Sequence, residues 1–277
     1  MTTPRQDFDL AMSVDWNQAW RVGRSRSKHR WDGREFWNKR AASFAAHARE
    51  SGYCNEVLAI LKPEADWSVL DIGCGAGTLA IPLASKVRSV TATDISDEML
   101  GHLEERCREL GLTNVRPVLA GWEDDWNATG VAQHDVVLAS RSFFAADLRA
   151  GVAKLNAFAR KRVMIVSLVG DGPYDRAIFD AVKRPLYRGP DFRFVTNYLA
   201  QEGIFANVTF IREVDDKTYA TLDEAVQGMR WMLDDLTPAE EMLLRAHLFE
   251  RCVPRDGGLA LPSPKVTRWA AIWWDRP

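Results

Sequence analysis

The chain has 277 residues, of which 47% are hydrophobic and 27% charged, and its 36 Lys and Arg nearly balance its 38 Asp and Glu. This length favours one large domain or two modest ones, and the composition excludes a disordered or fibrous chain. The balanced charge argues against a chain that binds polyanions over its whole surface, and no run reaches the roughly 20 apolar residues of a membrane span. Because residues 1–10 are polar rather than signal-like, we expect a cytoplasmic protein with no membrane partner.

The cysteines and histidines indicate no bound metal. The four cysteines are scattered without a C-x-x-C pair, and the five histidines form no H-E-x-x-H pattern. Sparse cysteines of this kind are typical of a reducing compartment, which agrees with the cytoplasmic location.

Residues 1–65 are predicted to form a helical N-terminal flank or lid, with one strong helix over 34–50. This flank holds four of the 11 tryptophans, which are Trp16, Trp20, Trp31 and Trp37. We expect the first two to pack the flank onto the rest of the protein. Residues 21–30 hold five basic side chains and no acid, and we interpret them as a mobile, solvated segment. Recruitment of RNA or of an anionic substrate by this segment is the alternative.

Residues 66–170 alternate between short β-branched runs and helical stretches. We expect strands at 68–72, 89–93, 115–119, 135–139 and 162–169. Helices are expected at 78–86 and over 147–160, and a third helix begins after an N-cap at Ser96. In the first of these, Pro82 either bends the helix or occupies its first turn. Strands that are apolar on both faces and alternate with helices predict a parallel sheet covered on both sides.

Residues 171–277 are predicted to add an insertion on the acceptor side, further helices and the closing strands of the same sheet. Helices are expected at 174–182 and 192–201, and strands at 208–214 and 267–274. Two capping boxes, Thr221 with Glu224 and Thr237 with Glu240, each open a helix. The predicted fold is therefore α/β, Rossmann-like and doubly wound, with a mostly parallel seven-stranded sheet whose last strand is antiparallel.

A glycine-rich turn follows the first strand of this sheet. The strand ends in Asp71, and Gly73, Gly75 and Gly77 lead into the next helix. Glycine permits the sharp turn and lets the backbone approach a flat ligand, where a Cβ would collide. The second strand is followed by Asp94, whose carboxylate can accept hydrogen bonds from both hydroxyls of a ribose.

Two details separate this turn from that of a dinucleotide fold. The dinucleotide pattern places its third glycine one position later, where this chain has Thr78. A carboxylate at Asp71 would repel a pyrophosphate, whereas it suits a ligand that carries an ammonium group and a sulfonium. The residues therefore favour S-adenosyl-L-methionine over NAD, and a nicotinamide-dependent dehydrogenase is the weaker alternative.

The segments VLDIGCGAG and TATDIS resemble the class I S-adenosylmethionine-dependent methyltransferases of the small-molecule type. The resemblance covers residues 35–169 and the final strand. It implies that the three glycines line the methionine and ribose side of the cofactor and that Asp71 orients its amino end. It also implies that Asp94 holds the ribose hydroxyls, that Ile95 packs on the adenine, and that Trp122 and Glu123 lie at the adenine edge.

Other residues take their expected roles from the same resemblance. Ser140 and Arg141, just after the fourth strand, fall where the methyl acceptor meets the sulfonium. Trp37 and Arg40 lie in a segment similar to the entry helix that precedes the core, where they would form a lid. Simpler roles stay open: Asp94 as a helix cap, Trp122 as a packing residue, Ser140 as a structural residue and Arg141 as a surface charge.

The acceptor is less well defined by the sequence. The Asn/Asp-Pro-Pro-aromatic signature for base amines and a Pro-Cys nucleophile are both absent, so we expect a small-molecule acceptor and no nucleic acid partner. No His–carboxylate pair marks a general base, so no catalytic residue is predicted. Residues 171–206, rich in Phe, Tyr and Arg, are the candidate acceptor wall, suited to an anionic aromatic or extended substrate. A non-catalytic, regulatory protein that binds the same cofactor is the alternative, and the oligomeric state stays open.

Overall fold

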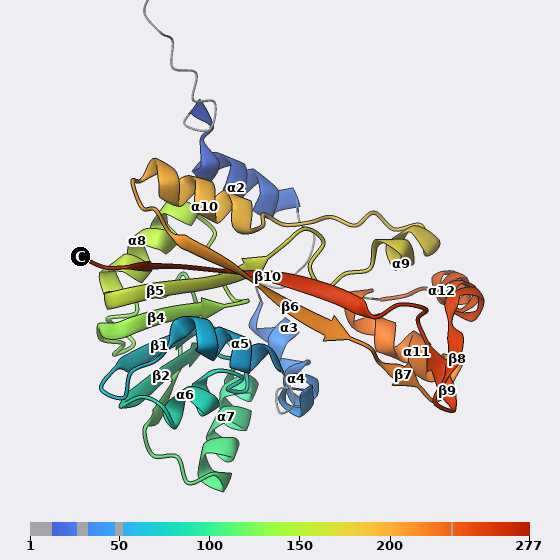
Figure 1. Cartoon of the computed structure of the whole chain (residues 1–277), viewed down its shortest axis with the longest axis horizontal. Coiled ribbons are helices and arrows are strands. Elements are labelled where there is room, and N and C mark those ends of the chain that lie inside the picture. Colours follow the sequence, from blue (N-terminus) through green and yellow to red (C-terminus); the bar gives the residue numbers. More distant parts are fainter. Residues whose placement is uncertain (1–12, 27–32, 48–51, 234) are drawn as a thin grey trace, which may run out of the picture. The chain divides into compact units, whose positions relative to one another are not determined.

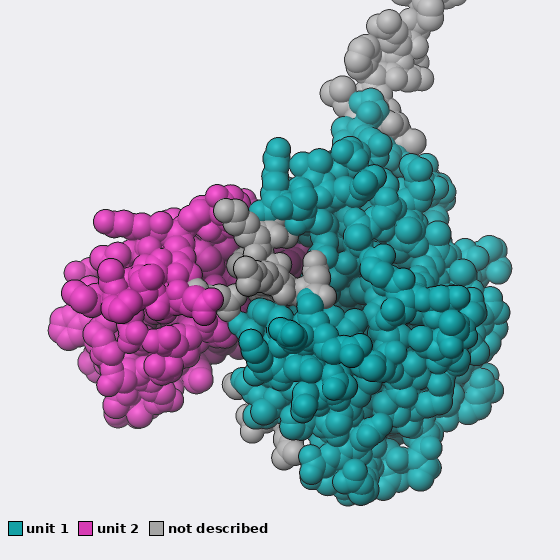
Figure 2. Space-filling model, turned by 180° about the vertical axis from the view of Figure 1, so that it is seen from behind, with its two compact units in different colours: residues 1–167, 189–211, 270–277 teal, residues 168–188, 212–269 magenta. Residues whose placement is uncertain are grey.

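The computed structural model describes residues 13–26, 33–47, 52–233 and 235–277. The chain divides into two compact units, shown in Figure 2. Unit 1 comprises Met1–Ser167, Gly189–Ile211 and Ala270–Pro277, and unit 2 comprises Leu168–Arg188 and Arg212–Trp269. This division joins the N-terminal flank to the core within one unit. The domain boundaries expected near residues 65 and 170 stay predictions.

A seven-stranded sheet has the order β3-β2-β1-β4-β5-β10-β6 (Figure 1). Strands β1 to β5 pair in parallel, and β10 is antiparallel, so the predicted fold class is confirmed. The strands are β1 (Ser68–Ile72), β2 (Ser89–Asp94), β3 (Val115–Leu119), β4 (His134–Ser140), β5 (Ala159–Leu168), β6 (Asn207–Asp215) and β10 (Lys265–Asp275).

The register of the central strands brings their polar ends to one edge of the sheet. Asp71 on β1 lies opposite Ala92 on β2 and Leu138 on β4. Every residue of β1 is buried, as expected of a strand covered on both faces. Since the chain order reverses between β1 and β4, this edge is the switch point at which such sheets hold ligands.

The helices of unit 1 cover the sheet, and several begin where the sequence predicts. Ser96 caps α7 by accepting a hydrogen bond from the Met99 amide, and Asp147 caps α8 in the same way. Pro82 lies in the first turn of α6, where a missing amide proton costs little. The helices are α2 (Trp16–Arg26), α3 (Arg34–Asn38), α4 (Ala41–His47), α5 (Gly52–Leu61), α6 (Ala80–Ala84), α7 (Asp97–Glu109), α8 (Leu148–Phe158) and α10 (Phe192–Gln201).

The prediction of one helix over 34–50 was wrong, because the chain turns at Lys39 and Arg40 between α3 and α4. The side-chain amide of Asn38 donates to Asp97 (3.0 Å) and its oxygen accepts from Ser96 (2.6 Å), which ties the end of α3 to the start of α7. The Arg40 guanidinium lies 3.7 Å from the Phe36 ring centre. These contacts favour a turn over a continuous helix; residues 48–50 lie outside the described part of the chain.

The prediction of a mobile segment at 21–30 was also wrong for its first six residues, which belong to α2. Trp20 on this helix is only 2% exposed, and its indole N–H donates to the Ala145 carbonyl (2.9 Å). As expected, Trp20 packs the flank onto the core, and α2 contacts both α8 and α10 (Figure 1). Residues 27–30 and Trp31 are not among the described residues.

Unit 2 has its own hydrophobic core, which includes Val226, Leu244 and Leu248. The capping box of Thr237 and Glu240 opens α12 as predicted. The box predicted at α11 is incomplete: Thr221 caps the helix, but the Glu224 carboxylate accepts from the Ala220 amide instead of the Thr221 amide. A small sheet of order β7-β9-β8 was not predicted, because strands of two or three residues carry no periodicity. The elements that lie wholly in unit 2 are α9 (Arg176–Ala181), β7 (Thr218–Tyr219), α11 (Leu222–Met229), the 3-10 helix η1 (Arg230–Met232), α12 (Pro238–Arg251), β8 (Val253–Arg255) and β9 (Gly258–Ala260).

Within the described ranges, no helix combines the length and the apolarity that crossing a bilayer requires. The same residues contain no cluster of three or more His, Cys, Asp or Glu side chains that could hold a metal ion.

Candidate functional site

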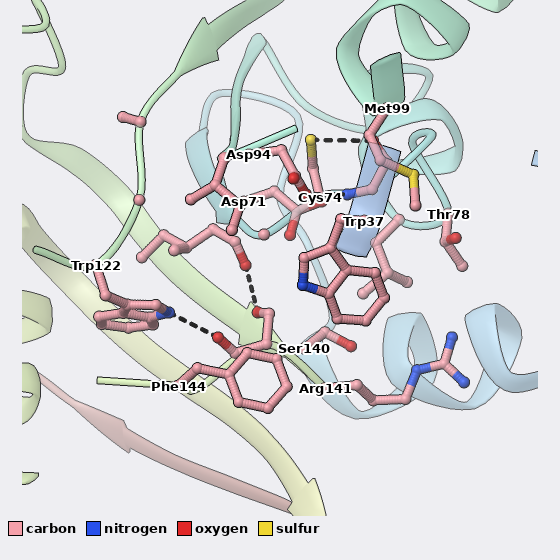
Figure 3. A pocket seen from close by; sticks show the side chains of 18 of the residues that line it. Trp37, Asp71, Cys74, Thr78, Asp94, Met99, Trp122, Ser140, Arg141 and Phe144 are labelled. Carbon is pink, nitrogen blue, oxygen red and sulfur yellow. Dashed lines mark hydrogen bonds between the residues drawn. The ribbon is translucent and has the colours of Figure 1, made fainter. Parts of the chain in front are cut away.

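A cavity of about 460 Å³ opens at the carboxyl edge of the sheet, within unit 1 (Figure 3). Its floor comes from the ends of β1, β2 and β4 and from the loop after β3, and its walls include residues of α2 to α5. In Figure 3, Asp71 and Asp94 lie close together, with the Trp122 and Phe144 rings on one side and Trp37 and Arg141 on the other. This is the edge at which the sequence predicts a cofactor.

The glycine-rich turn forms one side of the cavity. Gly73 and Gly75 have positive φ angles of 66° and 55°. A Cβ at Gly73 would lie 2.5 Å from the Cβ of Ser142, so no larger residue fits this turn without moving its neighbour. Gly77 has a different role: it does not line the cavity, and a Cβ there would meet Leu103 of α7 at 2.6 Å.

The Asp94 carboxylate is held by two backbone amides. One oxygen accepts from Gly75 (2.9 Å) and the other from Ser96 (2.9 Å). Burial raises the pKa of Asp94, and these hydrogen bonds act in the opposite direction. Because the N-cap of α7 is Ser96, the simpler role of Asp94 as the helix cap is excluded. Asp94 lines the cavity, and the two backbone hydrogen bonds fix the orientation of its carboxylate.

Asp71 is 2% exposed, and its Oδ2 has no hydrogen-bond partner among the described residues. Burial, and secondarily the negative charge of Asp94, raises the pKa of Asp71 to about 7. A buried oxygen without a partner in a cavity wall needs a ligand donor to satisfy it, and a cationic donor would also favour the charged form. The residues therefore fit a ligand with an ammonium group.

The loop after β3 forms another part of the cavity lining. Trp122 donates its indole N–H to the Ser142 carbonyl (2.6 Å), and Glu123 accepts from the Ala146 amide (3.2 Å). Lys154 on α8 donates to the carbonyls of Trp122 (2.8 Å) and Asp124 (2.5 Å) from outside the cavity. The loop is thus fastened at several points, and Trp122 both packs against its neighbours and lines the cavity.

The end of β4 contributes a hydroxyl and a guanidinium. The Ser140 Oγ lies 2.5 Å from the Tyr53 hydroxyl of α5, and the Arg141 guanidinium carbon lies 4.0 Å from the centre of the Tyr53 ring. Arg141 has a φ of 59°, a conformation uncommon outside glycine, Asn and Asp. Both Ser140 and Arg141 line the cavity.

The N-terminal flank closes the remaining side. Trp37 of α3 lines the cavity beside Phe44 of α4, and their rings meet edge to face with centres 5.5 Å apart. Arg34 donates to the Ile95 carbonyl (2.9 Å), which fixes α3 over the end of β2. Arg40, in contrast, does not line the cavity.

The cavity therefore brings together every predicted site residue except Gly77 and Arg40. Sequence reasoning missed Arg24, Tyr53 and Phe144, which also line it. The one available signal was helical spacing, since Arg24 lies one turn after Trp20 on α2. No residue of 171–206 is part of this lining, and the expected acceptor wall there stays a prediction.

Comparison with known proteins agrees with this site. The methyltransferase domain family matches residues 69–161. An uncharacterized protein of Haemophilus influenzae is 33% identical over 243 residues, which cover 86% of this chain and 88% of that protein. An uncharacterized RNA methyltransferase of Lactococcus lactis is 35% identical over 78 residues, which cover 27% of this chain and 15% of that protein.

A solved structure from Bacillus halodurans matches this chain with a TM-score of 0.55 at 14% identity. The match covers 82% of this chain and 100% of the Bacillus halodurans chain. At this identity the likeness concerns the fold alone. The family match, over residues 69–161, contains the glycine-rich turn and most of strands β1 to β4, which carry the cavity.

Proposed function

Since the chain belongs to the class I S-adenosylmethionine-dependent methyltransferases, we propose that it transfers the methyl group of this cofactor to a small-molecule acceptor. The observation that supports the small-molecule acceptor is the cavity itself. Its volume of about 460 Å³ and its aromatic walls are typical of small-ligand sites, and every described residue of its lining belongs to one compact unit.

In this proposal, the glycine-rich edge of the cavity holds the cofactor. Asp71 accepts from the ammonium group, and Asp94 accepts from the ribose hydroxyls. Ile95, Trp122 and Glu123 surround the adenine. Gly73 and Gly75 let the backbone of the turn approach the cofactor closely. The bound cofactor supplies an electrophilic methyl group, and the protein contributes orientation and the exclusion of water.

The acceptor end of the cavity is formed by Tyr53, Ser140, Arg141 and Phe144, with Trp37 and Phe44 covering it. The rings of Trp37 and Phe44 exclude water from the point of transfer, while Ser140 and Tyr53 offer hydroxyl groups that can orient an acceptor. We also place the reaction in the cytoplasm, on the basis of the scattered, sparse cysteines.

The decisive experiment is transfer of labelled methyl from the cofactor into an extract of the source organism. The extract is divided into a low-mass filtrate, RNA and protein, and we expect label in the filtrate. Asp94→Asn is the inactive control, because it weakens cofactor binding. Label released by ribonuclease would overturn the proposed acceptor class. Binding of S-adenosylhomocysteine without transfer to any fraction would instead favour the non-catalytic alternative. Because the family match is to a methyltransferase domain, the nicotinamide-dependent dehydrogenase alternative has no support.

A further inference from the structure

The side chain of Asn38, the last residue of α3, uses both ends of its amide. Its oxygen accepts from the Ser96 hydroxyl (2.6 Å), and its nitrogen donates to the Asp97 carboxylate (3.0 Å). The second hydrogen bond lowers the pKa of Asp97, so the acceptor is held in its charged form. Asn38 therefore joins α3 to the beginning of α7 through two hydrogen bonds of different kinds.

Ser96 links this contact to the carboxylate that is proposed to hold the ribose. The Ser96 amide donates to Asp94 (2.9 Å), and the Ser96 hydroxyl accepts from the Met99 amide (3.0 Å) while it donates to Asn38. Because Ser96 is fully buried, a change that removes the Asn38 oxygen takes away the acceptor of a buried hydroxyl. The end of α3 and the orientation of Asp94 thus depend on the same residue.

Trp37, which precedes Asn38, is the part of α3 that lines the cavity. It packs against a buried cluster that includes Met99, and Figure 3 shows the indole beside this methionine. At the other end of α3, the Arg34 side chain donates to the Ile95 carbonyl (2.9 Å). The helix is therefore fastened at its first and last residues to the chain that follows Asp94, and Trp37 lies between the two points.

We propose that Asn38 is a positioning residue, which keeps Trp37 in the cavity wall by holding α3 to the segment beside the cofactor. The proposal rests on the proposed function, in which Trp37 covers the acceptor. Only molecules with Trp37 in the wall bind the acceptor well, so the apparent affinity for the acceptor falls with the fraction of such molecules. Loss of the Asn38 contacts therefore raises the acceptor concentration for half-maximal rate more than it lowers the rate at saturation.

The first test reverses the hydrogen bond between Asn38 and Asp97. Asn38→Asp places two carboxylates opposite each other, whereas Asn38→Asp combined with Asp97→Asn restores the pair with donor and acceptor exchanged and keeps an oxygen for Ser96. Transfer of labelled methyl is measured over serial dilutions of whichever extract fraction accepts it. We expect the single variant to need about 5- to 30-fold more of that fraction for half-maximal labelling, with a maximal rate within about threefold. The double variant should return to within about threefold of the wild type.

The control is Asn55→Asp, which adds the same charge at an exposed position of α5 outside the lining and should change neither value. A merely structural role would lower the maximal rate and the unfolding midpoint but leave the half-maximal concentration unchanged, and this result would overturn the proposal. A double variant no better than Asn38→Asp would overturn it too. Label in RNA would refute the small-molecule function, while the comparison of variants would still decide the role of Asn38.

The second test needs no acceptor, so it also decides the proposal if no fraction is labelled. The protein is prepared with fluorotryptophan, and the fluorine resonance of Trp37 is assigned as the one missing from Trp37→Phe. In the complex with S-adenosylhomocysteine, we expect Asn38→Asp to shift or broaden this resonance and the double variant to restore it. Asn55→Asp should leave it as in the wild type. A Trp37 resonance that Asn38→Asp does not alter would mean that this side chain does not position the wall.

Discussion

Replacement of Asp71 by asparagine should strengthen folding and weaken cofactor binding at the same time. The pKa of Asp71 is about 7 in the folded protein against an ordinary value of 3.8, mainly because the carboxyl is buried and secondarily because Asp94 is close. A pKa that is higher in the folded state means that the neutral acid stabilises the fold. This contribution is complete below about pH 4 and is lost as the pH rises to about 7.

The size of the effect follows from the shift. About three pKa units correspond to about 4 kcal/mol of folding free energy between the neutral and the charged acid. Asp71→Asn removes the charge, so its midpoint of thermal unfolding should exceed that of the wild type at pH 8 and match it at pH 4. Glu56→Gln, at an exposed position of α5, is the control and should change neither value.

Cofactor binding should show the opposite dependence on pH. If the ammonium group binds only the charged carboxylate, the dissociation constant of S-adenosylhomocysteine falls about tenfold from pH 6 to pH 8 in the wild type. In Asp71→Asn this dependence should vanish, and affinity at pH 8 should drop by about 10- to 100-fold. Calorimetry at four pH values measures both. A dissociation constant that does not change with pH, or an unfolding midpoint at pH 8 that the substitution leaves unchanged, would refute the assigned charge state.

Three further predictions concern neighbouring residues. Asp94→Ala should weaken S-adenosylhomocysteine binding by about 10- to 100-fold in calorimetry, because it removes the proposed ribose acceptor, and unchanged affinity would contradict that role. Gly73→Ala should lower the free energy of unfolding by about 2 kcal/mol or more, since its Cβ would collide, whereas Gly111→Ala, with a similar φ of 65° and open space, should cost only about 1 kcal/mol in the same denaturation assay. Lys154→Met should release the loop after β3 and reduce cofactor affinity several-fold in calorimetry, with little loss of stability; an unaltered affinity would mean that the loop holds its shape without this lysine.

Local patterns were enough to predict the core of the fold. Strands β1 to β4 and helices α7 and α8 appear within a residue or two of their expected bounds, because burial on both faces and side-chain caps are visible in the chain itself. The cofactor edge follows from the same information, since parallel strands bring their carboxyl ends together. The boundary of β5, the break between α3 and α4 and the small sheet of unit 2 depend on neighbours distant in sequence.

The amino-acid sequence by itself determined the parallel sheet, the glycine-rich turn and the two carboxylates that end β1 and β2, because each depends on contacts between nearby residues or on strand order. Only the tertiary structure decided what stands opposite them. Arg24 meets Phe144 and Tyr53 meets Ser140 across 120 and 87 residues of chain, and such contacts leave no periodic signal. The N-terminal flank, which the length alone could have assigned to a separate domain, completes this cavity with residues of α2 to α5.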